Sequence, residues 1–263
     1  MTTAYERFKD LHGRDELFIM PNPWDVGSAK LLASLGFSAL ATTSSGHAAT
    51  LGRHDQRVSR DELVGHVEAM TAAVEVPLNV DSERLFATTP EGINETVGLL
   101  AAAGAAGCSI EDYDPATGAI DSVEVATERV AAAAAACRGR LVLTARAENY
   151  LYGEDDLSDT IERLVAYSEA GADCVYAPGL TDLEDIATVV LEVGTPLNVL
   201  TMPSGPAIGR LADVGVRRVS TGGALAWTAY GAMAAAATEL LTQGTSTFMR
   251  GALAAEDRRA FDE

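Results

Sequence analysis

At residues 170–176 the sequence reads AGADCVY, in which a glycine ends an amphipathic run and a short apolar segment follows at once. Glycine just after a helix takes the left-handed conformation that closes the helix, and an apolar segment bounded in this way is typical of a buried parallel strand. The same junction recurs as SLGFSALAT at 34–42, AGAAGCSI at 103–110 and VGVRRVS at 214–220. The recurrence indicates a chain of alternating helices and parallel strands.

Eight segments of the chain are candidate strands, near 17–20, 38–43, 76–81, 107–111, 140–145, 173–177, 195–200 and 216–220. Their mean spacing of about 29 residues leaves room for one strand, one helix and two short loops. We therefore predict an α/β fold, a (βα)8 TIM-type barrel. A doubly wound open sheet is the competing architecture, but no GxGxxG or GxxxxGK[ST] loop follows an early strand.

Capping signals mark the expected helix starts at Ser59-x-x-Glu62, Thr88-x-x-Glu91, Asp121-x-x-Glu124 and Thr181-x-x-Glu184, and Pro90 stands where a first helical residue should. Residues before about 15 are expected to form a helix that covers the bottom or side of the barrel. We expect residues 1–263 to form a single barrel domain, with C-terminal helices over about 225–263.

Composition excludes several classes of protein. The 263 residues carry a net charge of −19, which argues against nucleic acid as a partner. No run of about 18 apolar residues appears and the N-terminus lacks the pattern of a signal peptide, so we predict a cytoplasmic protein with no membrane partner. The cysteines at 108, 137 and 174 match no redox or zinc spacing and are expected to be buried free thiols.

Acidic residues follow two neighbouring candidate strands. Asp81 and Glu83 come after the third strand and Glu111 after the fourth. Active sites of such barrels lie at the carboxyl ends of the strands, and adjacent strands are about 5 Å apart, so these carboxylates should converge and repel one another. A Mg²⁺ ion, or Mn²⁺ as an alternative, would resolve the repulsion, and the lack of nearby His or Cys argues against zinc. In the alternative interpretation, Asp81 and Glu111 cap helices or pair with Arg84 and Arg146.

Arg146 follows the fifth candidate strand, where its guanidinium could donate to a substrate carboxylate or to an enolate oxygen. A structural ion pair with Glu111 or Glu148 is the other interpretation, and the two roles are compatible. After the second strand, Ser45, Gly46 and His47 lie in a turn whose hydroxyl and backbone N–H groups could bind an anion.

Six segments together resemble the isocitrate lyase/phosphoenolpyruvate mutase superfamily over roughly residues 15 to 230: Pro21-Asn22-Pro23-Trp24-Asp25, Thr43-Ser44-Ser45-Gly46, Leu51-Gly52-Arg53-His54-Asp55, Val80-Asp81-Ser82-Glu83, Ser109-Ile110-Glu111-Asp112 and Ala145-Arg146-Ala147-Glu148. The resemblance implies a Mg²⁺-dependent barrel that makes or breaks a carbon-carbon or carbon-phosphorus bond beside a 2-oxo or 2-hydroxy carboxylate. It also implies a homodimer or homotetramer that exchanges a C-terminal helix.

The resemblance also implies roles for single residues. Asp81 would be the main metal ligand, Glu83 and Glu111 would hold metal-bound waters, and Asp55 would support that arrangement. Ser45, Gly46 and His47 would bind the substrate carboxylate or phosphonate, Trp24 would wall the pocket, and Arg146 would stabilise the enolate.

Two departures from the pattern narrow the reaction. Glu83 stands where the superfamily commonly has Asp. The loop after Glu111 reads DYDPATGAI, without the Lys-Cys-Gly-His element of isocitrate and methylisocitrate lyases, and Thr117 is its one counterpart to the loop residues of the phosphonate enzymes. We therefore predict retro-aldol cleavage or decarboxylation of a small 2-hydroxy or 2-oxo di- or tricarboxylate through an enolate. Tyr113, His47 and a metal-bound hydroxide are candidate bases for retro-aldol cleavage. Alternatives are carbon-phosphorus chemistry of the phosphonopyruvate hydrolase or phosphoenolpyruvate mutase type, and a non-catalytic carboxylate-binding relative.

Overall fold

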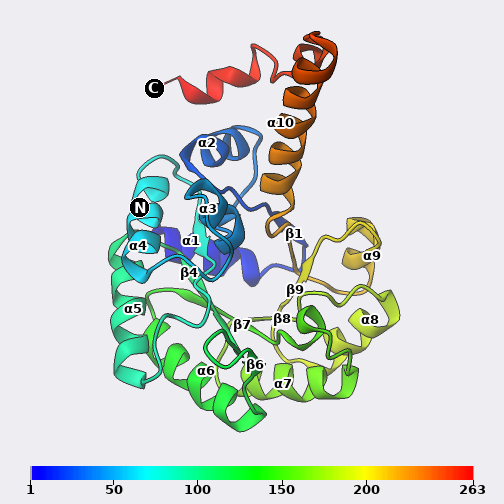
Figure 1. Ribbon diagram of the computed structural model, residues 1–263. Coiled ribbons are helices and arrows are strands. Elements are labelled where there is room, and N and C mark those ends of the chain that lie inside the picture. Colours follow the sequence, from blue (N-terminus) through cyan, green and yellow to red (C-terminus); the bar gives the residue numbers. More distant parts are fainter. Residues whose placement is uncertain (1, 263) are drawn as a thin grey trace.

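The computed structural model describes residues 2–262 and has eight parallel strands at its centre (Figure 1). In chain order these strands are β1 (Phe18–Met20), β2 (Leu40–Ala41), β3 (Leu78–Val80), β4 (Gly107–Glu111), β7 (Val142–Arg146), β8 (Cys174–Tyr176), β9 (Leu197–Leu200) and β10 (Arg218–Ser220). They pair in the order β1-β10-β9-β8-β7-β4-β3-β2. A hydrogen bond from the Ala41 amide to the Pro21 carbonyl, 3.1 Å long, joins the two ends of this sheet. The sheet is thus a nearly closed barrel, and the predicted α/β TIM-type fold is confirmed.

Helices surround the strands: α2 (Val26–Ser34), α3 (Ser44–Thr50), α4 (Arg60–Thr71), α5 (Pro90–Ala102), α6 (Val123–Cys137), α7 (Leu157–Glu169), α8 (Leu183–Glu192), α9 (Ile208–Asp213) and α10 (Ala224–Gln243). Short 3-10 helices are η1 (Asn149–Tyr152), η2 (Thr247–Gly251) and η3 (Asp257–Phe261). The glycines of the four repeated junctions have positive φ, 92° at Gly36, 88° at Gly104, 104° at Gly171 and 93° at Gly215. Each closes a helix just before a strand, as the sequence predicts.

The predicted helix caps are correct at one position and displaced by one residue at three. Ser59 caps α4 with the expected reciprocal bonds to Glu62. The caps of α5, α6 and α8 are Thr89, Ser122 and Asp182, so the predictions of Thr88, Asp121 and Thr181 were wrong. In each case two cap-forming residues are adjacent, and the second one has the extended backbone that lets its side chain accept from the first turn.

The bottom of the barrel is closed by α1 (Ala4–His12), as expected for the N-terminal segment. Phe8 is fully buried with Phe18 and Val142, which begin strands β1 and β7. Gly107 begins β4 at the same level, and a Cβ there would lie 2.7 Å from the Phe8 ring and 2.8 Å from the Val142 carbonyl oxygen. The helix therefore packs directly onto the amino ends of the strands.

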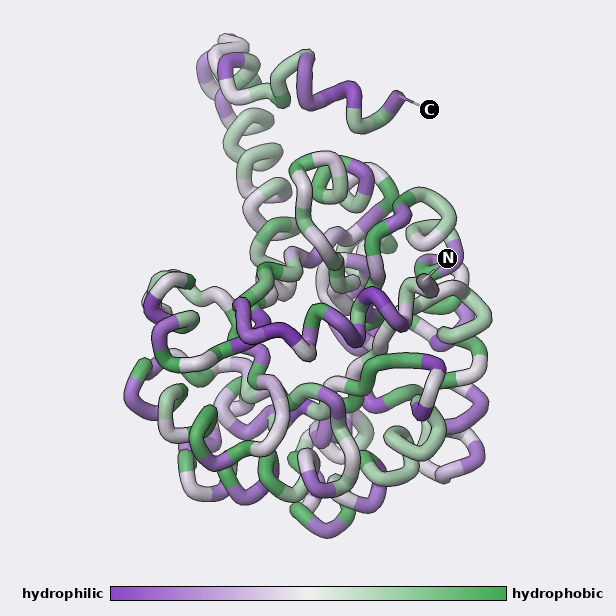
Figure 2. The backbone as a smooth tube through the Cα atoms, turned by 180° about the vertical axis from the view of Figure 1, so that it is seen from behind, coloured by the Kyte–Doolittle hydropathy of each residue, from purple (hydrophilic) through white to green (hydrophobic). Residues whose placement is uncertain are grey.

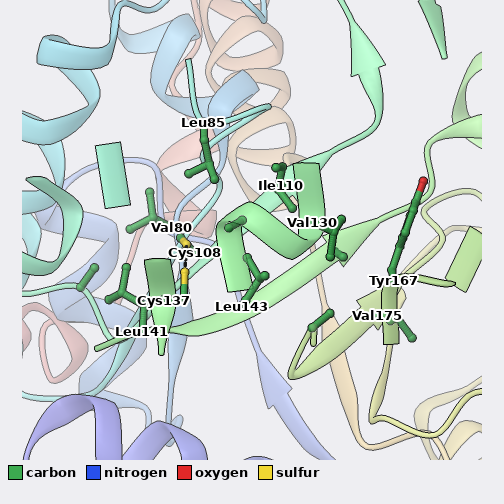
Figure 3. Packing of buried hydrophobic residues seen from close by; sticks show 14 of the residues in the cluster. Val80, Leu85, Cys108, Ile110, Val130, Cys137, Leu141, Leu143, Tyr167 and Val175 are labelled. Atoms are coloured by element: carbon green, nitrogen blue, oxygen red, sulfur yellow. Dashed lines mark hydrogen bonds between the residues drawn. The ribbon is translucent and has the colours of Figure 1, made fainter. Parts of the chain in front are cut away.

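The larger hydrophobic cluster lies between the barrel and its helices (Figure 3). Val80, Leu85 and Ile110 pack with residues of α6 and β7, and the Cys108 and Cys137 sulfurs are 3.6 Å apart. Cys108, Cys137 and Cys174 are all buried and free, which confirms the prediction for the thiols.

A small antiparallel hairpin that the sequence did not predict follows β4 and is formed by β5 (Tyr113–Asp114) and β6 (Ala119–Ile120). At the other end of the chain, α10 projects from the barrel and the segment after it turns back toward α2 (Figure 1). Figure 2 shows α10 as largely hydrophobic along its length. Within residues 2–262, no helix combines the length and apolar character needed to cross a membrane.

Candidate active site

A cavity of about 240 Å³ opens at the carboxyl ends of the strands. Arg146 is the last residue of β7, and Asp81 directly follows β3. Both line this cavity, together with Ser44, Ser45 and Asp55 from the segment after β2. The structure thus brings the predicted arginine and one predicted metal ligand to the mouth of the barrel.

Arg146 is shared by three carboxylates. Its Nη1 lies 2.8 Å from Asp81 Oδ1 and 2.8 Å from Glu111 Oε1, and its Nε donates to Glu148 Oε1 over 2.6 Å. Burial lowers the pKa of Arg146, but the charges of Glu111, Glu148 and Asp81 together raise it above its usual range. Arg146 is therefore a fixed cation, and the ion-pair interpretation raised by the sequence describes its contacts.

The orientation of Asp81 is set by the chain after β2. Its Oδ2 accepts a hydrogen bond of 2.9 Å from the Ser44 amide, the first residue of α3. Its own amide donates to Thr42 Oγ1 over 2.8 Å. Asp81 is thereby held between α3 and Arg146, with its carboxylate on the cavity.

Burial dominates the acid strength of the two glutamates beside Arg146. It raises the pKa of Glu111 well above its usual value and that of Glu148 to about 7, against the lowering effect of Arg146. Asp112 supports this pair, because its Oδ1 accepts from the Glu148 amide at 2.9 Å and its Oδ2 accepts from Tyr167 Oη at 2.7 Å. The loops after β4 and β7 are thus tied together below the cavity mouth.

Glu83 is buried, and its backbone carbonyl accepts a 3.0 Å hydrogen bond from the amide of Glu111. It lines a neighbouring cavity with Gln56 and Arg84, and its φ of 49° is in the left-handed region. Burial, Asp81 and Asp55 raise its pKa to about 8. Burial and Asp81 also raise the pKa of Asp55. The negative charge of Asp81 therefore raises the pKa values of Glu83 and Asp55, although neither carboxyl group shares a hydrogen bond with Asp81.

The predicted substrate-binding residues fall into two groups. Ser45 lines the cavity, and Gly46 lies behind it, where a Cβ would be 2.6 Å from Thr43 Cγ2 and 2.9 Å from Trp24 Cβ. His47 is buried and stacks on His66 with ring centroids 3.7 Å apart. Neither Trp24 nor His47 lines the cavity, and Trp24 packs against Gly46.

Two aromatic rings connect the loops above the site. Tyr113 of the β5–β6 hairpin stacks on Tyr152 of η1, with centroids 3.7 Å apart and an interplanar angle of 12°. The loop after Glu111 lacks the Lys-Cys-Gly-His element of the isocitrate and methylisocitrate lyases. It is folded back against the loop after Glu148.

The barrel mouth offers carboxylate oxygens, which are ligands that Mg²⁺ prefers. Among residues 2–262, no three His, Cys, Asp or Glu side chains lie close enough to hold one metal ion together. Mg²⁺ keeps several waters and commonly binds through one or two carboxylates, so a three-carboxylate inner shell is not required. Five carboxyl groups surround Arg146: Asp55, Asp81, Glu83, Glu111 and Glu148. The raised pKa values of Asp55, Glu83, Glu111 and Glu148 show that one cation does not offset burial and mutual repulsion of their charged forms, and a hard divalent cation bound to these oxygens would stabilise the ionised carboxylates.

Sequence reasoning missed a polar layer inside the barrel, below Arg146. Its members line the same cavity and come from β3, β4, β7, β9 and β10: Asn79, Ser109, Thr144, Asn198 and Arg218. A signal was present, because each is a polar residue between apolar neighbours within a strand, or at the first position of one. Such positions alternate with outward-facing residues and therefore face the barrel interior.

The fold and the arrangement of residues at the barrel mouth define a member of the isocitrate lyase/phosphoenolpyruvate mutase superfamily. Residues 8–241 match the family model described as phosphoenolpyruvate phosphomutase, and the chain belongs to this family.

Relatives cover most of the chain. An uncharacterized protein of Mycobacterium tuberculosis is 33% identical over 223 residues, 82% of this chain and 81% of its own length. Oxaloacetate decarboxylase of Paraburkholderia xenovorans is 30% identical over 237 residues, 87% of this chain and 76% of its own. A Burkholderia cenocepacia protein provisionally classed as a lyase/mutase has a crystal structure that superposes with a TM-score of 0.94, at 46% identity over 99% of this chain and 96% of that one. Other relatives are 2-methylisocitrate lyases.

Proposed function

We propose that the protein is a Mg²⁺-dependent lyase that cleaves a carbon-carbon bond, by retro-aldol cleavage or decarboxylation, in a small 2-oxo or 2-hydroxy di- or tricarboxylate. The observation that carries the proposal is Arg146, a buried cation held by three carboxylates on a cavity at the barrel mouth. Relatives named for carbon-carbon cleavage, the oxaloacetate decarboxylase and the methylisocitrate lyases, support the same reaction class.

Asp81 would hold the metal. Asp55 and Glu111 would add negative charge beside it, since Asp81 acts electrostatically on both. A bound Mg²⁺ would supply Lewis-acid polarisation of the substrate's carboxylate and adjacent oxygen. The Arg146 guanidinium can donate a hydrogen bond to an enolate oxygen as negative charge develops there. Its three carboxylate partners hold the side chain in this position. Ser45, on the same cavity, can donate its hydroxyl to a substrate carboxylate.

A screen of 2-oxo and 2-hydroxy diacids tests the proposal, with formation of pyruvate, glyoxylate or carbon dioxide as the readout. Turnover should disappear in EDTA and return with Mg²⁺ or Mn²⁺. Asp81→Asn should lose metal binding and turnover, whereas Asp61→Asn, at a carboxylate 89% exposed on α4, should retain both. Full turnover by Asp81→Asn would contradict the metal mechanism. Binding of oxalate without turnover of any diacid would contradict the lyase assignment.

A further inference from the structure

Arg218 is a cation inside the barrel that the proposed chemistry does not use. Its side chain starts from β10, is 1% exposed and lines the cavity beneath Arg146. Its Nε donates to Asn198 Oδ1 over 2.8 Å and its Nη2 to Thr144 Oγ1 over 3.0 Å. Its Nη1 lies 3.0 Å from His12 Nε2 at the barrel bottom. The guanidinium therefore spans the barrel floor from β10 to β7.

None of these partners carries a negative charge. His12 accepts from Arg218 as a neutral ring, because burial and Arg218 itself lower the pKa of His12 to about 3. Within the described chain, no Asp or Glu forms an ion pair with Arg218. A guanidinium has five N–H donors and three are used here, so two have no acceptor among residues 2–262.

Burying a charge without a counterion is costly, and such groups are normally paired. Arg146 shows the contrast, since the same cavity supplies it with three carboxylates. Arg218 is therefore a buried cation with two spare N–H donors on the same cavity, which indicates a missing anionic occupant.

We propose that this floor of the cavity is an anion subsite, centred on Arg218, that binds the substrate carboxylate remote from the metal. The assignment rests on the proposed function for the identity of the occupant, and it specifies that function further, because the preferred substrate is then a dicarboxylate. Arg146 and Asp81 would bind the reacting end of the molecule and Arg218 the other end.

Asn198→Asp tests the subsite with little change in shape. Aspartate is isosteric with asparagine and can accept from Arg218 Nε as Asn198 does, while Ser220 Oγ, which lies 2.9 Å from Asn198 Nδ2, can donate to its second oxygen. The variant thus supplies Arg218 with a permanent counterion. The matched control is Arg217→Met: Arg217 is the neighbouring arginine, pairs with Asp15 outside the barrel and does not line the cavity.

The first measurement is thermal unfolding in EDTA with increasing sodium formate. Screening of the net charge of −19 will raise the melting temperature of all three proteins. The wild type and Arg217→Met should show a larger, saturable rise than Asn198→Asp. An equal rise in all three proteins would overturn the subsite.

Two further measurements cover a poorly folded variant and the identity of the occupant. A wild-type crystal soaked in bromide should show an anomalous peak within hydrogen-bond distance of the Arg218 guanidinium, and a peak found elsewhere only would count against the subsite. With Mg²⁺ and a diacid substrate, Asn198→Asp should raise KM at least tenfold, more than it lowers kcat, and formate should compete with the diacid. An unchanged KM would overturn the assignment to the substrate's second carboxylate. If no diacid is turned over, the proposed function fails, and the formate titration still decides the subsite.

Discussion

At the scale of single residues, the candidate site depends on how Arg146 is held. Its fork of N–H donors reaches Asp81, Glu111 and Glu148 at once, from strands β3, β4 and β7. The sequence predicts the site residues that directly follow strands, because the carboxyl ends of parallel strands meet at one mouth. It offers an ion pair of Arg146 with these carboxylates as one interpretation but does not show that all three are bound at once, since that depends on the rotamer of a long side chain.

Arg146→Ala tests the role of this residue in catalysis. If Arg146 stabilises charge that develops in the reaction, kcat should fall by about 100-fold or more, as for the loss of a preorganised donor. Mn²⁺ affinity, measured by calorimetry, should change far less, because removing a cation does not remove the metal ligand Asp81. Arg53→Ala, which breaks the exposed pair with Glu62, is the control for loss of an arginine. Equal kcat in wild type and Arg146→Ala would refute the enolate role.

Gly107 is a residue at which packing leaves no space for a side chain. A Cβ there would lie 2.7 Å from Asn79 Oδ1 and 2.8 Å from the backbone oxygen of Val142, which cannot move without disturbing the β4–β7 ladder. Gly107→Ala should lower the free energy of unfolding by about 1–3 kcal/mol. Gly65→Ala, inside α4 with open space around the position, should raise it by about 0.5–1 kcal/mol. Urea unfolding of both variants checks the pair, and a stable Gly107→Ala would show that the strands can separate locally.

At the scale of elements, α1 is joined to the barrel by a hydrogen bond that depends on protonation. His12 Nδ1 lies 2.8 Å from the Phe8 carbonyl and its Nε2 lies 3.0 Å from Arg218 Nη1, so the ring donates to one and accepts from the other only when neutral. Burial first, and Arg218 second, lower its pKa from 6.5 to about 3. The unfolded chain binds a proton below pH 6.5 that the folded chain refuses, so this residue costs stability as the pH falls.

The corresponding measurement compares wild type with His12→Gln, which does not titrate. Between pH 7.5 and 5, the wild type should lose about 2 kcal/mol of unfolding free energy relative to the variant, from the shift in pKa. Carboxylates with raised pKa values act in the opposite direction in both proteins, so the difference between the two isolates His12. Parallel curves for His12→Gln and wild type would exclude a neutral His12 as the acid-sensitive contact.

Elements differ in how well their sequences specify them. All eight barrel strands could be predicted, because a glycine with forced left-handed backbone precedes half of them and turn signals bound the rest. The β5–β6 hairpin could not, since strands of two residues carry no periodic pattern, and the stacking of its Tyr113 on Tyr152 joins residues far apart in the sequence. The sequence places Arg218 in a short strand but does not show to which side of the strand its side chain points. Only the fold shows that Arg217 faces outward while Arg218 faces the cavity.

At the scale of the whole molecule, α10 extends from the barrel with little of its surface covered (Figure 1). Its exposed apolar side chains include Met233 at 61% and Leu241 at 87% relative exposure. Contiguous exposed apolar surface of this kind marks a site of protein association. The predicted homodimer or homotetramer therefore has a candidate interface on this helix.

Sedimentation analysis of the double variant Met233→Asp/Leu241→Asp checks this interface. The wild type should sediment as a dimer or tetramer, and the variant should shift to a smaller species, because each substitution would bury a carboxylate against an apolar partner surface. Leu191→Asp, at an apolar residue of α8 that is 85% exposed, should leave the mass unchanged. Higher salt should strengthen association of the wild type by screening the net charge of −19 on each chain. A wild type that sediments as a monomer at high salt would refute self-association, and an unchanged mass in the double variant would place the interface elsewhere.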